Sequence, residues 1–515
     1  MKFLEGITPR EYQQKIFETC SEKNCLVVLP TGLGKTLIGL MLAINRMEKH
    51  PEEKIVFLAP TRPLAEQHLS SFKKHLPDLF ADMQLFTGKI PAKQRKNIWK
   101  TADIIFSTPQ CVSNDVKNGL YDLKEVSLLI EDEAHRCIKN YAYNYVAKKY
   151  KEQAKNQRIV GLTASPGSEA KKIKEICKNL NIEEVELRTR ESLDVKEYLQ
   201  ELEFVKIIVD FPPEFEEIRK VLKKIFDGYV TELKRRRLLW EFPSKTKLIG
   251  LQKKLMSGLA RSSKNFNVML GVSACAQAIK VQHALELLET QTLEIFNNYL
   301  KDLMKQAADK KSKGVIKLVK MPEFNFIFLQ TSELLKKGKE HPKVNLLKGL
   351  VQNEKLKDKN TKIIVFTQFR GTALKISENV NKLPGVISKV FVGQAKKAGS
   401  GLSQKEQKRI INEFSSGEIN VLCATSIAEE GLDIPEVNAV IFYEPIPSAI
   451  RAIQRAGRTA RLMKGKLIIL ITKNTRDEAH YYISRSREKK MHSAIGKVRK
   501  DLASGNLKET QKKLV

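Results

Sequence analysis

The sequence predicts an α/β fold in which two parallel-sheet domains are separated by a helical insertion. Short apolar runs alternate with helical patterns in residues 25–164, and the same alternation returns in residues 362–472. Continuous apolar runs are typical of strands that are buried on both faces of a parallel sheet. Between these regions, residues 205–345 carry apolar side chains at helical spacing, with few helix-breaking residues.

The individual elements follow in chain order. The first domain is expected to contain strands at 25–30, 55–60, 103–108, 128–133 and 159–164, with helices such as 64–75 between them. Long helical patterns occupy 218–240 and 275–300, and further strands are expected at 362–367, 419–425, 439–445 and 466–472. The predicted domains are therefore 1–204, 205–345 and 346–475, followed by a basic helix and tail at 476–515.

Composition narrows the class of protein. The 515 residues are too many for a single core, so roughly two to four domains are expected. The net charge of +32 favours a polyanionic partner such as DNA or RNA. Seven cysteines lack the spacing of a zinc site, no signal peptide precedes them, and no apolar run reaches membrane-spanning length. We therefore expect a cytoplasmic protein that has no membrane partner.

A glycine-rich loop follows the first apolar run. LPTGLGKT at 29–36 stands between a predicted strand and a predicted helix, as in loops that wrap backbone N–H groups around phosphate. Lys35 would reach the terminal phosphates, and the Thr36 hydroxyl would bind Mg²⁺. Leu29 departs from the strict pattern, which has glycine there. We expect ATP and Mg²⁺ as cofactors, with the loop residues Thr31, Gly32, Leu33, Gly34, Lys35 and Thr36 binding the nucleotide.

Two further motifs complete the predicted catalytic set. In DEAH at 132–135, Asp132 would bind the metal, and Glu133 would orient and deprotonate the attacking water. In QRAGRTAR at 454–461, Arg458 and Arg461 would stabilise charge on the γ-phosphate, and Gln454 would position phosphate or water. Together with Lys35, these residues predict ATP hydrolysis.

The three motifs in this order resemble those of a superfamily 2 DEAH-box helicase. The resemblance implies two RecA-like domains with ATP in the cleft between them. By that resemblance Gln13, in ITPREYQ, reads adenine, and Gly431 and Asp433, in ATSIAEEGLDIP, lie near the nucleotide. The motifs after other strands would contact the nucleic acid strand through Thr61, Arg62, Gly88, Thr108, Thr367 and Thr425.

A narrower resemblance rests on the insertion and on residues 283–291 and 475–492. These look most similar to the helicase part of archaeal Hef, in the FANCM/Mph1 family. In that family the insertion resembles a polymerase thumb and grips branched duplex DNA, a role that falls here on the basic residues Arg235, Arg236 and Arg237. Full-length Hef also carries a nuclease, whose motif does not occur here, so we expect a separate or missing nuclease domain.

The sequence thus predicts an ATP-dependent DNA helicase or translocase that remodels or unwinds forked and branched DNA. Two alternatives remain open. One is an RNA-directed ATPase of the same superfamily, and the other is an ATP-gated clamp that binds branched DNA without separating strands. Nothing in the sequence indicates an oligomeric state.

Overall fold

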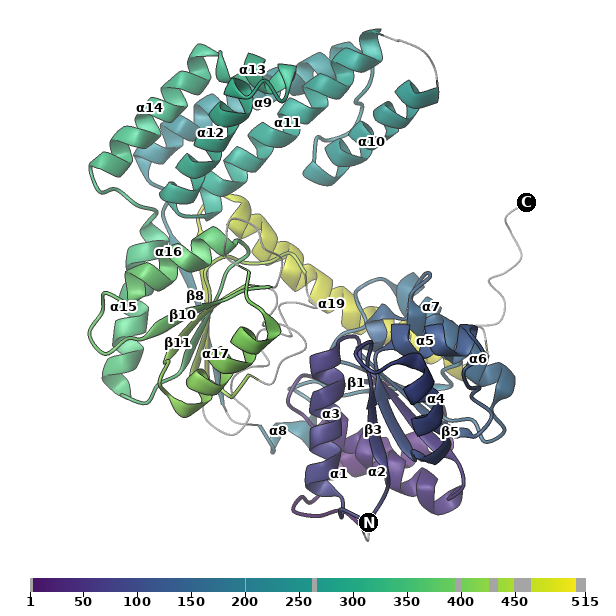
Figure 1. The fold of residues 1–515 in the computed structure, drawn as a ribbon. Helices are drawn as coiled ribbons and strands as arrows, with labels where there is room; N and C mark the ends of the chain where they lie inside the picture. Colours follow the sequence, from purple (N-terminus) through teal and green to yellow (C-terminus); the bar gives the residue numbers. More distant parts are fainter. Residues whose placement is uncertain are drawn as a thin grey trace.

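The computed structural model describes residues 3–199, 201–261, 266–393, 401–425, 434–448 and 465–505. They form a seven-stranded sheet, a six-stranded sheet, a helical bundle beside the second sheet and a long C-terminal helix (Figure 1). The predicted α/β class, with two parallel sheets and helices inserted between them, is confirmed. No helix among the described residues is long and apolar enough to cross a membrane.

The first sheet has the strand order β3-β4-β2-β5-β6-β1-β7, and all its strands are parallel. Its central strands coincide with the continuous apolar runs, whereas both edge strands are half-exposed and were not predicted. The strands are β1 (Cys25–Val28), β2 (Lys54–Leu58), β3 (Met83–Phe86), β4 (Ile104–Ser107), β5 (Val126–Asp132), β6 (Ile159–Thr163) and β7 (Glu184–Leu187).

Helices cover both faces of the first sheet and form a core on each face. One face is covered by α1 (Glu11–Glu22), α2 (Lys35–Lys49), α3 (Arg62–His75) and the short α8 (Leu193–Lys196). The other face is covered by α4 (Ala92–Thr101), α5 (Pro109–Lys117), α6 (Ala142–Gln153) and α7 (Ala170–Asn179), with the 3₁₀ turn η1 (Ala134–Arg136) after β5.

The second sheet has the order β10-β11-β9-β12-β13-β8. Its strands are β8 (Leu202–Val209), β9 (Ile363–Phe366), β10 (Ser388–Phe391), β11 (Val421–Ala424), β12 (Ala439–Phe442) and β13 (Gly465–Thr472). Strand β8 pairs with β13 along its whole length, so the boundary expected at 204/205 falls inside a strand of this sheet. Helices α15 (Pro342–Lys357) and α16 (Arg370–Val380) cover one face, and α17 (Gln404–Ser416) covers the other.

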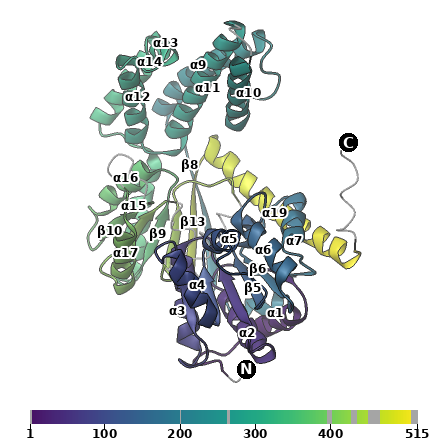
Figure 2. The ribbon, with the colours of Figure 1, turned by 45° about the vertical axis from the view of Figure 1, so that its right-hand side comes forward.

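The insertion is a helical bundle that is attached to the second sheet (Figures 1 and 2). Its helices are α9 (Pro213–Arg235), α10 (Lys245–Arg261), α11 (Phe266–Thr290), α12 (Leu293–Ala308), α13 (Lys313–Val319) and α14 (Pro322–Lys336). The pattern at 275–300 is split because the Thr292 hydroxyl accepts a hydrogen bond from the Ile295 N–H (3.4 Å) and starts a new helix. Beside it, the Thr372 hydroxyl of α16 donates to the buried Gln291 side chain (2.7 Å) and fastens the bundle to the second domain.

The C-terminal helix α19 (Arg476–Ala503) connects all three parts of the molecule. It starts where the insertion meets the second sheet and crosses to the first domain, as both views show (Figures 1 and 2). Its later turns enter the core of the first domain through the buried residues Met491, Ala494, Ile495 and Val498. The helix predicted as a charged tail element therefore ties the first domain to the second.

Candidate nucleotide site and nucleic-acid interface

The glycine-rich loop lies between β1 and α2, at the carboxyl edge of the first sheet. Gly32 and Gly34 have φ angles of 88° and 84°, a left-handed conformation that side chains rarely adopt. A Cβ on Gly34 would also collide with the Gln13 amide. Directly after it, Lys35 opens α2, and its ammonium donates to the Leu29 carbonyl (3.0 Å). The loop therefore has the backbone that phosphate binding requires.

Helix α1 holds the loop from behind through two adjacent side chains. The Tyr12 hydroxyl and the Gln13 amide both donate to the Leu33 carbonyl, at 2.8 Å and 3.0 Å. Both side chains are buried. The adenine-reading role of Gln13 stays a prediction, while this contact is a second role. Sequence reasoning missed Tyr12, although its position beside Gln13 in ITPREYQ is a signal for it.

A histidine joins the two residues predicted to bind the metal. His68, on α3, has Nε2 2.9 Å from Asp132 Oδ2 and Nδ1 3.2 Å from Thr36 Oγ1. The residue is 5% exposed, and its imidazole packs on the Phe57 ring, with 4.3 Å between ring centroids. Sequence reasoning missed His68, because a lone histidine on a helix has no local spacing that links it to either partner.

The electrostatic surroundings keep Asp132 ionised. Burial alone would raise its pKa, but the His68 hydrogen bond and the nearby Lys35 ammonium hold the pKa below its ordinary value. A hydroxyl and an ionised carboxylate are oxygen donors of the kind that Mg²⁺ prefers, with water and nucleotide phosphates completing its shell. Thr36 and Asp132 therefore fit the predicted metal role in their chemistry.

Glu133 follows in a left-handed backbone conformation, with φ of 53°. Its carboxylate pairs with His135 Nδ1 (3.2 Å), which also lies 3.3 Å from the Thr163 hydroxyl at the end of β6. The Ser165 N–H donates to the same hydroxyl (3.1 Å), and the Ser165 hydroxyl contacts the Met491 sulfur of α19 (2.8 Å). The predicted general base is thus linked through β6 to the helix that crosses between the domains.

The residues predicted to contact the nucleic acid follow neighbouring strands of the first sheet. Gly88 comes after β3, Thr108 after β4 and Thr61 after β2, and these strands are consecutive in the sheet. Nucleotide residues follow β5 and β1 on the other side. Because parallel strands end at one edge of a sheet, the predicted nucleic-acid contacts and the predicted nucleotide residues lie side by side at this edge.

Arg62 is held in an ion-pair network between the domains. Its guanidinium pairs with Glu66 (2.6 Å), and the second oxygen of Glu66 accepts from Lys408 of α17 (2.9 Å). Both domains therefore meet at α3, and Arg62 is engaged by protein in this structure. Its contact with nucleic acid stays a prediction.

The predicted contacts of the second domain follow adjacent strands. Thr367, after β9, is fully buried, and its hydroxyl donates to Glu444 (3.2 Å), so this side chain is committed to the interior of the domain. The neighbouring Gln368 is exposed. Thr425, after β11, is 7% exposed, and its N–H donates to the Phe391 carbonyl (3.1 Å). Burial thus argues against a direct strand contact by the Thr367 side chain.

Five predicted site residues lie outside the described part of the chain. They are the predicted nucleotide neighbours and the QRAGRTAR residues: Gly431, Asp433, Gln454, Arg458 and Arg461. Their roles stay predictions.

The three insertion arginines lie at the end of α9 and have different surroundings. Arg236 pairs with Glu232 (2.9 Å) and donates to the Asn267 side chain (2.9 Å), so it holds α9 against α11. Arg235 and Arg237 are exposed. The same segment presents two exposed aromatic residues, Trp240 at 78% and Phe242 at 81%. The exposed cations and aromatic rings together form what we call the insertion tip: Arg235, Arg237, Trp240 and Phe242.

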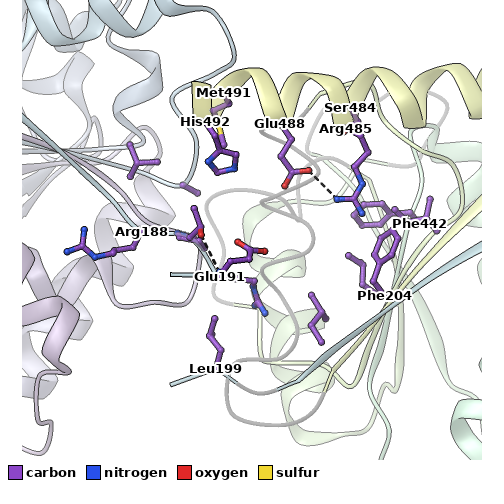
Figure 3. A pocket seen from close by; sticks show the side chains of 18 of the residues that line it. Arg188, Glu191, Leu199, Phe204, Phe442, Ser484, Arg485, Glu488, Met491 and His492 are labelled. Atoms are coloured by element: carbon purple, nitrogen blue, oxygen red, sulfur yellow. Dashed lines mark hydrogen bonds and ion pairs between the residues drawn. The ribbon is translucent and has the colours of Figure 1, made fainter. Parts of the chain in front are cut away.

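A cavity of about 680 Å³ separates the two domains beside the glycine-rich loop (Figure 3). Pro30 and Ala164 line it from the first domain, and Phe204 and Phe442 line it from the second. Helix α19 closes one side, where Arg485 pairs with Glu488 (3.4 Å) and lies 4.7 Å from the centroid of the Phe204 ring. None of residues 31–36, which are predicted to bind the nucleotide, lines the cavity, so it is a space between the domains beside the predicted phosphate site.

Comparison with known protein families finds matches to the first domain, the second domain and the helical insertion. Residues 10–173 match the DEAD/DEAH box helicase family, and residues 342–463 match the helicase conserved C-terminal domain. Residues 214–335 match a helical-bundle family that is provisionally described as belonging to ATP-dependent RNA helicases.

The relatives include archaeal and fungal proteins. A protein of Methanocaldococcus jannaschii, provisionally named an ATP-dependent RNA helicase, is 40% identical over 94% of this chain and 60% of its own length. The ATP-dependent DNA helicase fml1 of Schizosaccharomyces pombe is 33% identical over 92% of this chain and 58% of its own length. The ATP-dependent DNA helicase mph1 of Sclerotinia sclerotiorum is 32% identical over 92% of this chain. The chain spans only 40% of that last relative.

A solved structure covers almost the same region. The crystal structure of the Pyrococcus furiosus Hef helicase domain is 42% identical, with a TM-score of 0.71, over 93% of this chain and 98% of that chain. The two sheets are therefore RecA-like domains with a helical bundle between them. On this similarity and the matched families, the chain belongs to the superfamily 2 helicases of the Hef/FANCM type.

Proposed function

We propose that this chain uses ATP hydrolysis to translocate along DNA and to remodel or unwind forked and branched DNA. The observation that carries the proposal is the arrangement at the edge of the first sheet. Thr36 and Asp132 face one histidine there, while the predicted strand contacts follow the neighbouring strands β2, β4 and β3. The residues proposed to bind the nucleotide therefore lie next to those proposed to bind the DNA strand, so that ATP hydrolysis can change the contacts with the strand.

Each residue of the site has a specific task in the proposed reaction. Lys35 holds the β- and γ-phosphates, and Glu133 orients and deprotonates the attacking water. Arg458 and Arg461 stabilise the charge that develops on the γ-phosphate, and Gln454 positions phosphate or water. Mg²⁺, held through Thr36 and Asp132, would neutralise phosphate charge when bound.

The proposed substrate is DNA with a branch point. Two curated relatives are named as DNA helicases, and the net charge of +32 suits a polyanion. The insertion tip offers exposed cations for phosphates and aromatic rings on which unpaired bases can stack. We propose the cytoplasm, at the nucleoid, as the site of action.

We further propose a division of labour among the expected domains. Residues 1–204 and 346–475 would form the ATP-driven motor, with strand 202–209 assigned to its second sheet. Residues 205–345, from α9 onwards, would recognise the branch, and 476–515 would connect these parts.

RNA is a second candidate substrate. The names of the M. jannaschii relative and of the helical-bundle family both refer to ATP-dependent RNA helicases. A dependence of binding on the 2′-hydroxyl distinguishes RNA from DNA at a given site. Matched DNA and RNA forks therefore decide between the two candidates.

Glu133→Gln is expected to separate ATP binding from hydrolysis. The amide keeps the size of the side chain but cannot accept a proton, so we expect kcat to fall by about 10²–10⁴-fold with ATP binding retained. Single-turnover hydrolysis and fluorescent-nucleotide binding measure the two properties. Glu125→Gln, a change at an exposed residue that directly precedes β5, is the matched control. Wild-type kcat in Glu133→Gln would assign the base to another residue.

Charge reversal at the insertion tip is expected to weaken branched-DNA binding more than binding of plain single strands. In Arg235→Glu/Arg237→Glu, the slope of log affinity against log salt should become shallower by about 1 to 2, because each phosphate contact contributes about 0.9. Fluorescence anisotropy over a salt series measures this slope.

The matched control for the insertion tip is Lys336→Glu/Lys337→Glu, which reverses two exposed charges at the C-terminal end of α14 in the same bundle. Equal effects of the two double variants would show that total charge, not the insertion tip, determines the preference.

A further inference from the structure

His68 has no role in the motifs discussed so far, yet it is the side chain that joins the two predicted metal-binding residues. One ring nitrogen lies 3.2 Å from the Thr36 hydroxyl, and the other lies 2.9 Å from Asp132. The histidine and its two partners come from three separate elements, α3, α2 and the end of β5. A single imidazole therefore determines the relative position of the two oxygen ligands.

The chemistry of the ring determines its hydrogen bonds. An ionised carboxylate only accepts, so Nε2 carries the proton that it donates to Asp132. In the neutral ring Nδ1 then accepts, and the Thr36 hydroxyl donates to it. That hydrogen bond turns the hydroxyl proton towards the histidine and the remaining lone pairs of the oxygen away from it. The same ring thus orients a hydroxyl and a carboxylate as metal ligands.

The protein holds the imidazole in place by packing. The ring is buried and lies against Phe57 of β2, with an interplanar angle of 33°. It lies two residues along α3 from Glu66, which pairs with Lys408 of the second domain (2.9 Å). Imidazole nitrogen is a poor ligand for Mg²⁺, so His68 acts on the oxygen ligands and not on the metal itself.

We propose that His68 is a positioning residue, which pre-orients Thr36 and Asp132 for Mg²⁺ bound with the nucleotide. The inference rests on the proposed ATP-dependent function. Hydrogen bonds to metal-binding carboxylates typically change metal affinity by about 10–100-fold. Loss of the imidazole should therefore raise the Mg²⁺ requirement while leaving the metal-free nucleotide contacts of the glycine-rich loop intact.

The test is binding of a fluorescent ADP analogue, N-methylanthraniloyl-ADP, measured in EDTA and across a Mg²⁺ titration. For His68→Ala we expect the half-saturating Mg²⁺ concentration to rise by about 10–100-fold. Affinity in EDTA should stay within about twofold of wild type. His68→Gln keeps a donor and an acceptor, and its Mg²⁺ requirement should fall between those of wild type and His68→Ala. His75→Ala, the same residue type at the far end of α3, should match wild type in both conditions.

The outcomes separate this inference from the proposed function. Wild-type Mg²⁺ requirements in both His68 variants would overturn the positioning role and leave the ATP site intact. An equal loss of affinity with and without Mg²⁺ would also overturn it, because a structural defect affects both conditions. Failure of the wild-type protein to bind the ADP analogue at all would instead contradict the proposed function.

Discussion

Lys35→Ala is expected to reduce ATP turnover by at least about 10²–10³-fold, because it removes a pre-positioned positive charge from the transferring phosphates. The lysine opens α2 directly after the left-handed Gly34, and the loop sequence LPTGLGKT contains no second lysine or arginine. Binding to DNA should persist, since contacts with phosphate are spread over many residues. Steady-state ATP hydrolysis and fluorescence anisotropy with labelled DNA measure these two results.

The matched control for this prediction is Lys49→Ala, which removes an exposed lysine at the other end of the same helix. Its turnover should equal that of wild type. Turnover in Lys35→Ala within a few fold of wild type would contradict the assignment of the phosphate-binding loop. Equal losses in both lysine variants would point to destabilisation of α2.

Asp477→Ala is expected to destabilise the second domain by about 3–5 kcal/mol, because it leaves a buried ammonium without its counter-ion. Lys343 and Asp477 are both fully buried, and their charged atoms are 2.7 Å apart. Lys343 also donates to the Thr290 carbonyl at the end of α11 (2.8 Å). The pair therefore joins the second domain, the insertion and the start of α19.

Hydrogen exchange of backbone amides measures this effect locally. The free energy of opening should fall for β13, which the Asp477 carboxylate contacts through Thr472 (2.9 Å), and not for β2 in the first sheet. Glu333→Gln breaks an exposed pair with Lys337 on α14 and should change neither. The double variant Lys343→Met/Asp477→Leu should recover part of the loss, because it removes the unpaired charge but leaves the Thr472 donors without an acceptor. Equal protection of β13 in Asp477→Ala and wild type would contradict a structural role for the pair.

The central strands of both sheets could be predicted from the sequence because they are buried on both faces. Strand β9 is an example, since all its residues, IIVF, are apolar and buried. Strand β8 was not predicted, although six of the eight residues in LEFVKIIV are apolar, because it directly precedes a helix-rich stretch and was assigned to it. Its place depends on pairing with β13, which lies far away along the chain.

The residues expected at the nucleotide were proposed from the sequence for a different reason, and their roles stay predictions. Lys35, Thr36 and Asp132 belong to short motifs in which the residue types and their local spacing indicate the chemistry. His68 contacts Asp132, and Tyr12 contacts the Leu33 carbonyl. Both contacts join residues that are distant along the chain, so they could not be predicted from local spacing. Arg236 was expected to face DNA because the insertion resembles that of Hef. It pairs with Glu232 one turn earlier, and its contact with DNA stays a prediction.

The most direct test of ATP-driven action on branched DNA is the ATP hydrolysis rate on a panel of nucleic acids. Single-stranded, duplex, forked and four-way DNA and a matched RNA fork are compared at equal nucleotide concentration. We predict that DNA stimulates hydrolysis, that forked and four-way DNA stimulate it most, and that the RNA fork stimulates it less than its DNA counterpart. Hydrolysis that no DNA stimulates, or that RNA stimulates more strongly than every DNA, would contradict the proposal.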